Sequence, residues 1–337
     1  MAVGQAALAA PDAAGAALTH GAELASASAA GSAGQLHAVA AVSATDVWAV
    51  GCSGGCNGPD SLVLHWNGKK WSKVASPDPS TVSSLLFGVT AVSGTDVWAA
   101  GSEIPDASTL LSTTMVLHWN GKKWSRVHSP TVSDASTTLY GVSADSATDA
   151  WAVGNECIYP ACPDPGITTD TFTMHWNGKK WSRVASPSFG GTNNVLFGVS
   201  ALRPDNAWAV GDSSVTGALI VHWNGKKWSE VPAANPGSAF NDLQAVSAAS
   251  AEDIWAAGDQ LGASLPFDTL TEQRDGSAWT AVASPNGTTS DTGVNMLAGV
   301  AAISSRDAVA VGWAQSKGGP FYQVLILKWN GTRWVIA

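Results

Sequence analysis

The sequence predicts an all-β protein built from repeated four-stranded antiparallel sheets, the architecture of a β-propeller. Two motifs recur along its 337 residues. The first, Trp-Asn-Gly-Lys-Lys-Trp, begins at Trp66, Trp119, Trp176 and Trp223, with variants at Trp329–Trp334 and Arg274–Trp279. The second, typified by Asp-Val-Trp-Ala-Val-Gly, recurs every 47 to 57 residues, at Trp48, Trp98, Trp151, Trp208 and Trp255, with Val309 in the sixth copy. A period of roughly 50 residues with one small sheet per unit is typical of propellers.

Each repeat contains four expected strands. In the second repeat they are residues 86–92, 97–100, 114–119 and 122–127. Asn120-Gly121 lies between the last two, and Asn-Gly between alternating apolar runs is a strong hairpin signal, for which we expect a type I′ turn with positive φ at both residues. First strands carry Gly or Ala (Gly88, for example) because innermost strands converge on the axis.

Six repeats cover Leu36–Ala337, so six blades are expected. Seven is the alternative, in which residues 1–35 form a degenerate blade. Met1-Ala2-Val3-Gly4 resembles Trp-Ala-Val-Gly and lies 47 residues before Trp48, and Leu18-Thr19-His20 would be a third strand. The Ala, Gly and Ser composition of residues 1–35 argues against it. This segment is otherwise the remnant of an export signal or a linker.

These repeats resemble the WNG-repeat propellers of secreted actinobacterial proteins, a bacterial family similar to kelch and sialidase Asp-box repeats. The resemblance covers Leu36–Ala337, and the Asp-box likeness rests on Asp275-Gly276-Ser277-Ala278-Trp279. It implies the propeller fold and a turn-locking role for the box. Such propellers include lectins, enzymes and scaffolds, so the resemblance leaves the function open.

The cysteines indicate the compartment. Cys52 and Cys56 lie close together in one loop, and Cys157 and Cys162 in the equivalent loop two repeats later. We expect two local disulfides and a secreted, extracellular protein. A zinc site shared by both pairs is excluded because a blade separates them. Residues 1–35 contain no Lys or Arg, so we do not expect an intact signal peptide here, although Ala7–Pro11 resembles a cleavage site.

The expected loops divide into two faces. Turns that join strands one to two and three to four are nearly invariant, whereas those between strands two and three, and between blades, vary and are expected to bind. The variable loops are rich in Asp, in line with a formal net charge of −9. An acidic face repels phosphates, so nucleic acid is not an expected partner. The longest apolar runs are strand-length, so no membrane span is expected.

Three sets of residues are candidates for binding. Trp313, Phe321 and Tyr322 flank one variable loop and would form an aromatic platform for a sugar ring, with loop packing as the alternative. The residue after the leading Leu of each first strand varies and would line a central pocket: His37, Phe87, Tyr140, Phe197, Gln244 and Ala298. Asn155, Asp212 and Asp259 occupy equivalent positions in successive blades and would be calcium ligands. No other metal or cofactor is expected.

No pattern indicates catalysis. The arginines are not grouped as in a sialidase site, and no nucleophile motif or phosphate loop is present. We therefore expect a non-catalytic exported binding module, a monomer or part of a larger secreted assembly, that holds a protein partner or a neutral glycan on its variable, acidic face. The alternatives are a carbohydrate-binding lectin proper and a glycoside hydrolase whose carboxylate pair the sequence does not single out.

Overall fold

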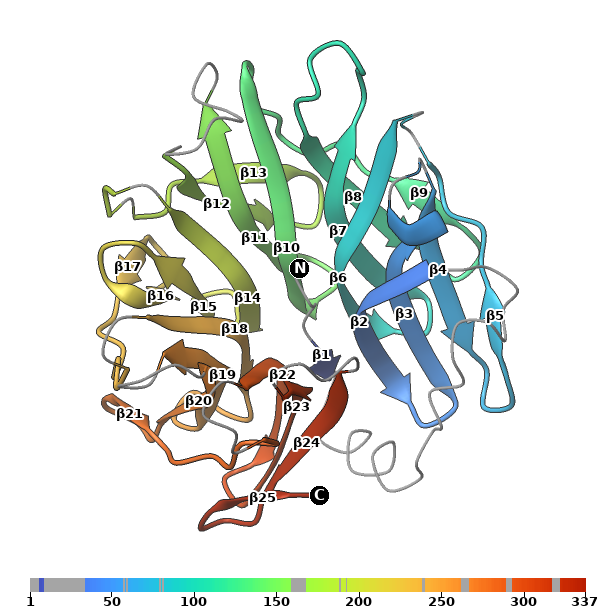
Figure 1. The fold of residues 1–337 in the computed structure, drawn as a ribbon. Coiled ribbons are helices and arrows are strands. Elements are labelled where there is room, and N and C mark those ends of the chain that lie inside the picture. Colours follow the sequence, from blue (N-terminus) through green and yellow to red (C-terminus); the bar gives the residue numbers. More distant parts are fainter. Residues whose placement is uncertain are drawn as a thin grey trace.

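The computed structural model describes residues 6–8, 34–56, 58, 60–78, 80, 82–158, 168–187, 189–191, 193–237, 240–261, 267–288, 293–316 and 322–337. The chain forms six units of four antiparallel strands, arranged as blades around a central axis (Figure 1). Strand order within each blade follows the sequence, from the innermost strand outwards. The predicted all-β propeller of six blades is therefore confirmed. Among the described residues, no helix has the length and apolar character needed to cross a bilayer.

The blades have the following bounds. Blade 1 contains β2 (Gly34–Ser43), β3 (Asp46–Ser53), β4 (Ser61–Trp66) and β5 (Trp71–Lys73). Blade 2 contains β6 (Ser83–Ser93), β7 (Asp96–Ile104), β8 (Thr113–Trp119) and β9 (Trp124–Arg126). Blade 3 contains β10 (Ala135–Ser146), β11 (Asp149–Ile158), β12 (Asp170–Trp176) and β13 (Trp181–Val184). Blade 4 contains β14 (Asn194–Arg203), β15 (Asn206–Ser213), β16 (Gly217–Trp223) and β17 (Trp228–Glu230). Blade 5 contains β18 (Asn241–Ala248), β19 (Ile254–Leu261), β20 (Phe267–Arg274) and β21 (Trp279–Ala281). Blade 6 contains β22 (Val294–Ser304), β23 (Asp307–Gln315), β24 (Gln323–Trp329) and β25 (Trp334–Ile336).

Two short elements lie outside this pattern. The 3-10 turn η2 (Gly54–Cys56) follows β3, and β1 (Ala6–Leu8) pairs in parallel with β2. Strand β1 also contacts β6 and β22, the first strands of blades 2 and 6.

The Asn-Gly turns differ from the predicted type I′ geometry. In blade 1, Trp66 and Trp71 close the hairpin as cross-strand partners, which leaves a four-residue loop. Gly68 has a φ of 85°, whereas Asn67 is not among the residues with positive φ. Instead, the Asn67 side-chain oxygen accepts hydrogen bonds from the backbone N–H groups of Lys69 (3.0 Å) and Lys70 (3.1 Å). The asparagine is thus required for a side-chain turn rather than for left-handed backbone.

The other repeated polar residues also support the fold. His65 stacks on Trp48 with a centroid distance of 4.3 Å, and its Nε2 lies 2.8 Å from Asp46 Oδ1. The Trp66 indole N–H donates to the Ala44 carbonyl at 3.2 Å. His118 makes the equivalent contacts in blade 2. His65 and His118 therefore pack against the second-strand tryptophans and support the fold.

Tryptophans join neighbouring blades. Trp48 of blade 1 packs against Trp119 and Trp124 of blade 2, with centroid distances of 4.9 and 5.3 Å. Trp98, Trp151 and Trp255 each pack in the same way against two tryptophans of the next blade. Among the described residues, apolar cores of this kind join blades 1 and 2, 2 and 3, 3 and 4, 4 and 5, and 5 and 6.

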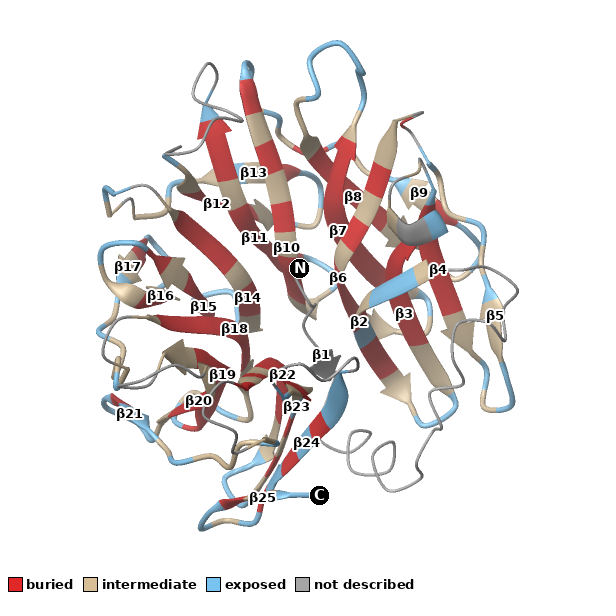
Figure 2. Ribbon diagram, in the orientation of Figure 1, coloured by how far each residue is buried: buried red, intermediate tan, exposed pale blue. Residues whose placement is uncertain are grey.

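The boundary between blade 6 and blade 1, here called the seam, is different. Leu36 of blade 1 is 37% exposed, whereas its counterparts in the other blades, Leu86 and Leu139 among them, are fully buried. On blade 6, Val311 is 37% exposed, although Val50 and Val153 occupy the same register and are fully buried. Figure 2 shows much of β24 coloured as exposed. Among the described residues, the apolar faces on the two sides of the seam do not share a core.

Candidate functional site

Every first strand contains a β-bulge at the same place. In β2, the pairing with β3 shifts between Leu36 and Ala38, so His37 has no cross-strand partner. The same shift leaves one bulge residue in each other blade: Phe87, Tyr140, Phe197, Gln244 and Ala298. An unpaired bulge residue redirects its side chain. The six positions predicted from the sequence to line a central pocket are therefore the six bulge residues of the innermost strands.

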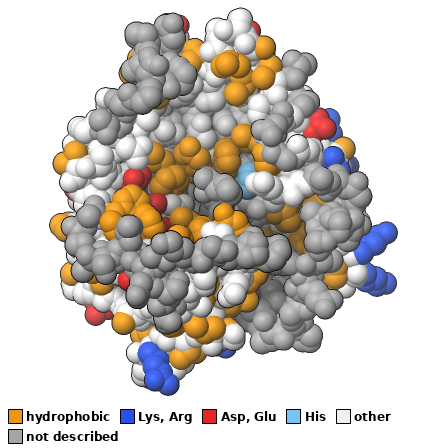
Figure 3. Space-filling view, viewed as in Figure 1, with side chains coloured by type: hydrophobic (Ala, Val, Ile, Leu, Met, Phe, Trp, Pro, Cys, Tyr) orange, Lys and Arg blue, Asp and Glu red, His pale blue; other side chains and the backbone are white. Residues whose placement is uncertain are grey.

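Four of these side chains form a continuous row, here called the aromatic arc. The ring centroids lie 5.0 Å apart for His37 and Phe87, 5.3 Å for Phe87 and Tyr140, and 5.4 Å for Tyr140 and Phe197. All four are half-buried. Figure 3 shows a hollow at the centre of the molecule, bordered by hydrophobic side chains, a histidine and acidic groups. The structure thus brings together residues from four blades that are distant in sequence.

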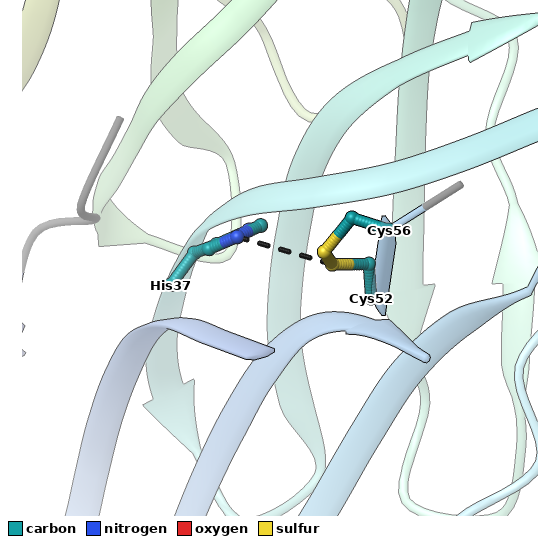
Figure 4. Close-up of side chains that lie close together, drawn as sticks. All are labelled: His37, Cys52 and Cys56. Carbon is teal, nitrogen blue, oxygen red and sulfur yellow. Dashed lines mark hydrogen bonds between the residues drawn. A yellow bond between two sulfur atoms is a disulfide. The ribbon is translucent and has the colours of Figure 1, made fainter. Parts of the chain in front are cut away.

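His37 ends the arc beside a disulfide (Figure 4). Its Nδ1 lies 2.8 Å from the Leu86 carbonyl oxygen, which assigns the ring proton to Nδ1. Nε2 then presents its lone pair towards Cys52 Sγ at 3.9 Å. Burial lowers the pKa of His37, so the ring is neutral at pH 7.

The predicted Cys52–Cys56 disulfide is confirmed. Cys157 is also disulfide-bonded, and Cys162 lies outside the described residues. Among the described residues, His37, Cys52 and Cys56 have potential metal-ligand atoms within 4.8 Å of one another. Because both sulfurs are consumed in the disulfide, they are not thiolate ligands in this state.

Beyond the other end of the arc lie three acidic residues, here called the aspartate cluster: Asp212, Asp242 and Asp259. Asp242 on β18 is the direct cross-strand partner of Asp259 on β19, and Asp212 belongs to β15 of the preceding blade. The Gln244 side-chain N–H donates to Asp242 Oδ2 at 2.5 Å. This bond connects the cluster to a bulge residue of the central pocket.

The environment of the cluster raises its pKa values. Burial raises the pKa of Asp259 to about 7, and the Asp212 carboxylate adds to the effect. Burial raises the pKa of Asp212 to about 6, although hydrogen bonds from the Asn193 amide act to lower it. Asp242 is raised well above its usual range by burial and by both neighbouring aspartates. Burial and like charge both disfavour the ionised carboxylate, so near pH 7 the cluster retains protons.

This arrangement combines flat apolar surfaces with polar groups at one end. Aromatic faces bind the C–H faces of sugars or other flat apolar surfaces. The half-buried Asp212 can form hydrogen bonds with hydroxyl groups, whereas Gln244 is buried and its amide donates to Asp242. Apolar walls with a few oriented polar groups are the usual composition of small-ligand sites.

Two of the residues predicted to form an aromatic platform lie in blade 6. Trp313 and Tyr322 contact each other edge to face at 4.7 Å, while Phe321 lies outside the described residues. Trp313 lies within β23, which continues to Gln315. By the alternation of β23, it shares a side with Val311 at the seam.

The calcium site of Asn155, Asp212 and Asp259 stays a prediction, and the structure adds Asp242 to the two aspartates. Asn155 is the cross-strand partner of Thr138 and Thr171 in blade 3, whereas the electrostatic partner of both aspartates is Asp242. Sequence reasoning missed Asp242. The signal that could have found it is its position in the repeat, where only this blade has an acidic residue. The equivalent first-strand positions hold Gln35, Leu85, Thr138, Val195 and Met296.

Comparisons with known proteins identify the architecture. No family model matches the chain, and no curated protein matches it. The solved structures of similar fold include a variant of the Aleuria aurantia lectin in complex with Fucα1-6GlcNAc, with a TM-score of 0.54 and 15% identity over 90% of this chain and 94% of that one. They also include an ulvan lyase bound to GlcA(1-4)Rha3S, with a TM-score of 0.53 and 12% identity over 90% of this chain and 80% of that one. A third is YCF48 bound to D1 peptide, with a TM-score of 0.51 and 12% identity over 90% of this chain and 81% of that one.

The chain is a β-propeller. At identities this low, the likeness shows the fold alone, and the three neighbours hold three different kinds of ligand. The resemblance to WNG-repeat propellers continues to rest on the repeated motifs.

Proposed function

We propose that this β-propeller is a non-catalytic carbohydrate-binding protein that holds a neutral sugar in its central pocket. The observation that carries the proposal is the aromatic arc, in which Phe87, Tyr140 and Phe197 follow one another at 5.3 and 5.4 Å. Three successive blades present a ring at the same bulge, and a sugar ring lies flat against such a surface.

The polar end of the pocket favours a neutral ligand. The half-buried Asp212 offers carboxyl oxygens that can form hydrogen bonds with sugar hydroxyl groups. An anionic sugar would place a further negative charge beside carboxyl groups whose pKa values like charge already raises, which disfavours it relative to a neutral sugar. The Aleuria aurantia lectin, a propeller neighbour, was solved with Fucα1-6GlcNAc, so fucosides are reasonable first ligands to test.

Burial of the carboxyl groups supports binding without cleavage. A general acid must come within hydrogen-bond distance of the glycosidic oxygen. Asp242 and Asp259 are only 7% and 2% exposed. Asp242 accepts a hydrogen bond from Gln244, and at this depth neither carboxyl group reaches a substrate, so a glycoside hydrolase has less support than a binding site.

We also propose that the protein is exported. The Cys52–Cys56 disulfide supports this location, because such bonds persist in oxidising compartments.

Ligand binding to single-site variants tests the proposal. Glycan-array screening of the labelled protein is followed by calorimetry with the best neutral sugar. We expect Phe87→Ala and Tyr140→Ala to weaken binding by about tenfold each, since each removes one aromatic contact. Tyr322→Ala is the matched control because it removes an exposed aromatic side chain outside the arc. Loss of binding in Tyr322→Ala alone would transfer the site to the Trp313 loop.

The same material distinguishes a glycan from a protein partner. If the array is silent and a stoichiometric protein partner is recovered whose binding Tyr140→Ala abolishes, the pocket is a protein-binding site and the carbohydrate proposal is wrong. Cleavage of a bound glycan by the wild-type protein would contradict the non-catalytic assignment.

A further inference from the structure

The disulfide at the end of the aromatic arc has an imidazole directed at it (Figure 4). His37 Nε2 lies 3.9 Å from Cys52 Sγ, and the ligand atoms that His37, Cys52 and Cys56 can offer to a metal all lie within 4.8 Å of one another. His37 comes from β2, Cys52 from β3 and Cys56 from the turn η2 that follows. In the part of the chain that the structure describes, this is the one group of three such ligands so close together.

The second cysteine pair of the chain does not have this arrangement. Cys157 of blade 3 is also disulfide-bonded, but it comes three residues after Gly154, whereas Cys52 directly follows the equivalent Gly51. The bulge residue of blade 3 is Tyr140, not a histidine. A disulfide that closes a loop needs no imidazole beside it, so loop closure does not account for the histidine in blade 1.

We propose that His37, Cys52 and Cys56 bind a zinc ion when the disulfide is reduced. Thiolate sulfur and neutral imidazole are ligands that zinc prefers, and the three residues between the cysteines are within the spacing found in zinc sites. In a tetrahedral site with Zn–S of about 2.3 Å and Zn–N of about 2.1 Å, the sulfur and the nitrogen lie roughly 3.6 Å apart. His37 Nε2 and Cys52 Sγ are close to this separation already.

Two of the three ligands are held in place by the sheet. His37 Nδ1 donates to the Leu86 carbonyl of the next blade at 2.8 Å, which leaves the Nε2 lone pair for a metal. Metal-binding histidines usually donate their other ring N–H to an acceptor of this kind. Cys52 is fully buried, and its backbone pairs with Gln35 on one side and Ser61 on the other.

The third ligand lies in a segment with room to move. Zinc requires the two sulfurs to separate from bonding distance to about 3.8 Å, the edge of a tetrahedron with Zn–S of about 2.3 Å. Cys56 ends the three-residue turn η2, which begins at Gly54. Gly54 is exposed, and no atom lies within 4 Å of the place that a side chain on it would take. The turn can therefore shift while Cys52 stays in β3.

A dithiol reductant opens the site by thiol–disulfide exchange. Its thiolate attacks the sulfur of Cys56, which is less buried than Cys52, and Cys52 leaves as a thiolate. The second thiol of the reductant then releases Cys56, so the protein gains two electrons and the reductant becomes a disulfide. Zinc binding displaces the thiol protons. The disulfide and the zinc site exclude each other, so the same three residues respond to the redox state.

The zinc ion would lie beside the central pocket, because His37 is also the first ring of the aromatic arc. Three protein ligands leave the fourth position of a tetrahedral zinc ion to water or to another oxygen ligand. This inference does not depend on the carbohydrate proposal, since it concerns the reduced protein and the metal alone.

Zinc titration of the full chain tests the proposal. Cys157→Ser and Cys162→Ser form the background, which leaves only the two cysteines of this site. By calorimetry in two buffers, we expect the reduced protein to bind one zinc ion and to release about two protons. The unreduced protein should bind zinc at least about tenfold more weakly, because thiolates are the metal ligands. Equal affinity before and after reduction would overturn the proposal.

The histidine is tested by a matched pair of variants in the same background. His37→Ala should weaken zinc binding at least about tenfold, because loss of a direct ligand costs no less than loss of an outer-shell partner. His128→Ala is the control, since this histidine is exposed after β9. Unchanged affinity in His37→Ala would overturn the three-ligand site.

A second measurement needs no substitution. In the reduced wild-type chain, we expect zinc to slow alkylation of Cys52 and Cys56 at least about tenfold, as mapped by mass spectrometry, because a metal-bound thiolate is a poorer nucleophile. Cys157 should react at the same rate with and without zinc. Protection of Cys157 equal to that of Cys52 would show that zinc binds any reduced pair, and the proposal would be wrong.

Discussion

Asp242 and Asp259 lie directly opposite each other on β18 and β19, and each has one buried carboxylate oxygen without a hydrogen-bond partner among the described residues. Like charges opposite each other destabilise a sheet, and an unpaired buried carboxylate is costly. Protonation removes both costs, which agrees with the raised pKa of both residues. The cluster is therefore a pH-dependent source of instability next to the binding pocket.

The first prediction concerns Asp259→Asn. The pKa of Asp259 is raised from 3.8 to about 7, so between these values the folded protein keeps a proton that the unfolded chain loses. This contribution to stability is fully present below about pH 4 and is lost as the pH rises through about 7. The shift corresponds to roughly 4 kcal/mol. The neutral Asn should raise the unfolding free energy at pH 8 by up to this amount and leave it unchanged at pH 4, as measured by urea denaturation.

Asp106→Asn is the control for this effect. Asp106 is exposed in the loop between β7 and β8, and hydrogen bonds from Ser108 lower its pKa. Its replacement should give no gain at pH 8. An equal gain in both variants would attribute the effect to net charge and not to the buried cluster.

The repeat carries most of the fold information. The period of the Trp motifs predicts the number of blades, because each copy encodes one four-stranded sheet whose side chains recur at fixed positions. The geometry of the Asn-Gly turns was harder to predict from the sequence. Asn67 satisfies the type I′ pattern and also a side-chain turn, and only the backbone shows that the second occurs.

The candidate site was partly predictable. The variable position after the leading Leu identified Phe87 and Tyr140, since a residue that departs from a repeat is free for another purpose. Their mutual stacking depends on the β-bulge, for which residue order gives little signal. The sequence analysis missed Asp242 because its place in the cluster depends on two things that residue order does not give. These are its pairing with Asp259 across the sheet and the packing of the preceding blade. The open seam could not be predicted, because the exposure of its side chains depends on how the neighbouring blades pack.

A second prediction concerns the ion pair between the buried Glu103 on β7 and the exposed Arg126 on β9. Glu103 is buried, and burial raises its pKa despite the nearby guanidinium. Arg126→Ala should lower the unfolding free energy by about 3 kcal/mol, because it leaves a buried carboxylate without its partner. The control is Arg203→Ala, which breaks the exposed pair with Asp205 and should cost about 1 kcal/mol or less. Equal losses in chemical denaturation would contradict the buried-pair account.

A third prediction concerns the Cys52–Cys56 disulfide, which closes a very short loop. Alkylation of the unreduced, freshly exported protein should label no cysteine, and reduction should raise the intact mass by about four hydrogen atoms if both predicted disulfides are present. Cys56→Ser should lower the unfolding free energy by about 2 kcal/mol, the chain-entropy value for a loop of this size. Labelling of Cys52 before reduction would contradict both the disulfide and an exported location.

The last prediction compares two tryptophans. Trp98 is 1% exposed and fits between Trp176 and Trp181 of the next blade. Trp98→Ala removes these contacts and leaves a cavity in an inter-blade core, so it should cost about 3–5 kcal/mol. Trp313 is half-buried on the seam side of β23 and contacts the exposed Tyr322, and its replacement by Ala should cost only about 1 kcal/mol. Thermal melts of both variants decide the comparison. If Trp313→Ala melts as low as Trp98→Ala, the side chain belongs to a tightly packed core, and the seam is closed more completely than its exposed valines indicate.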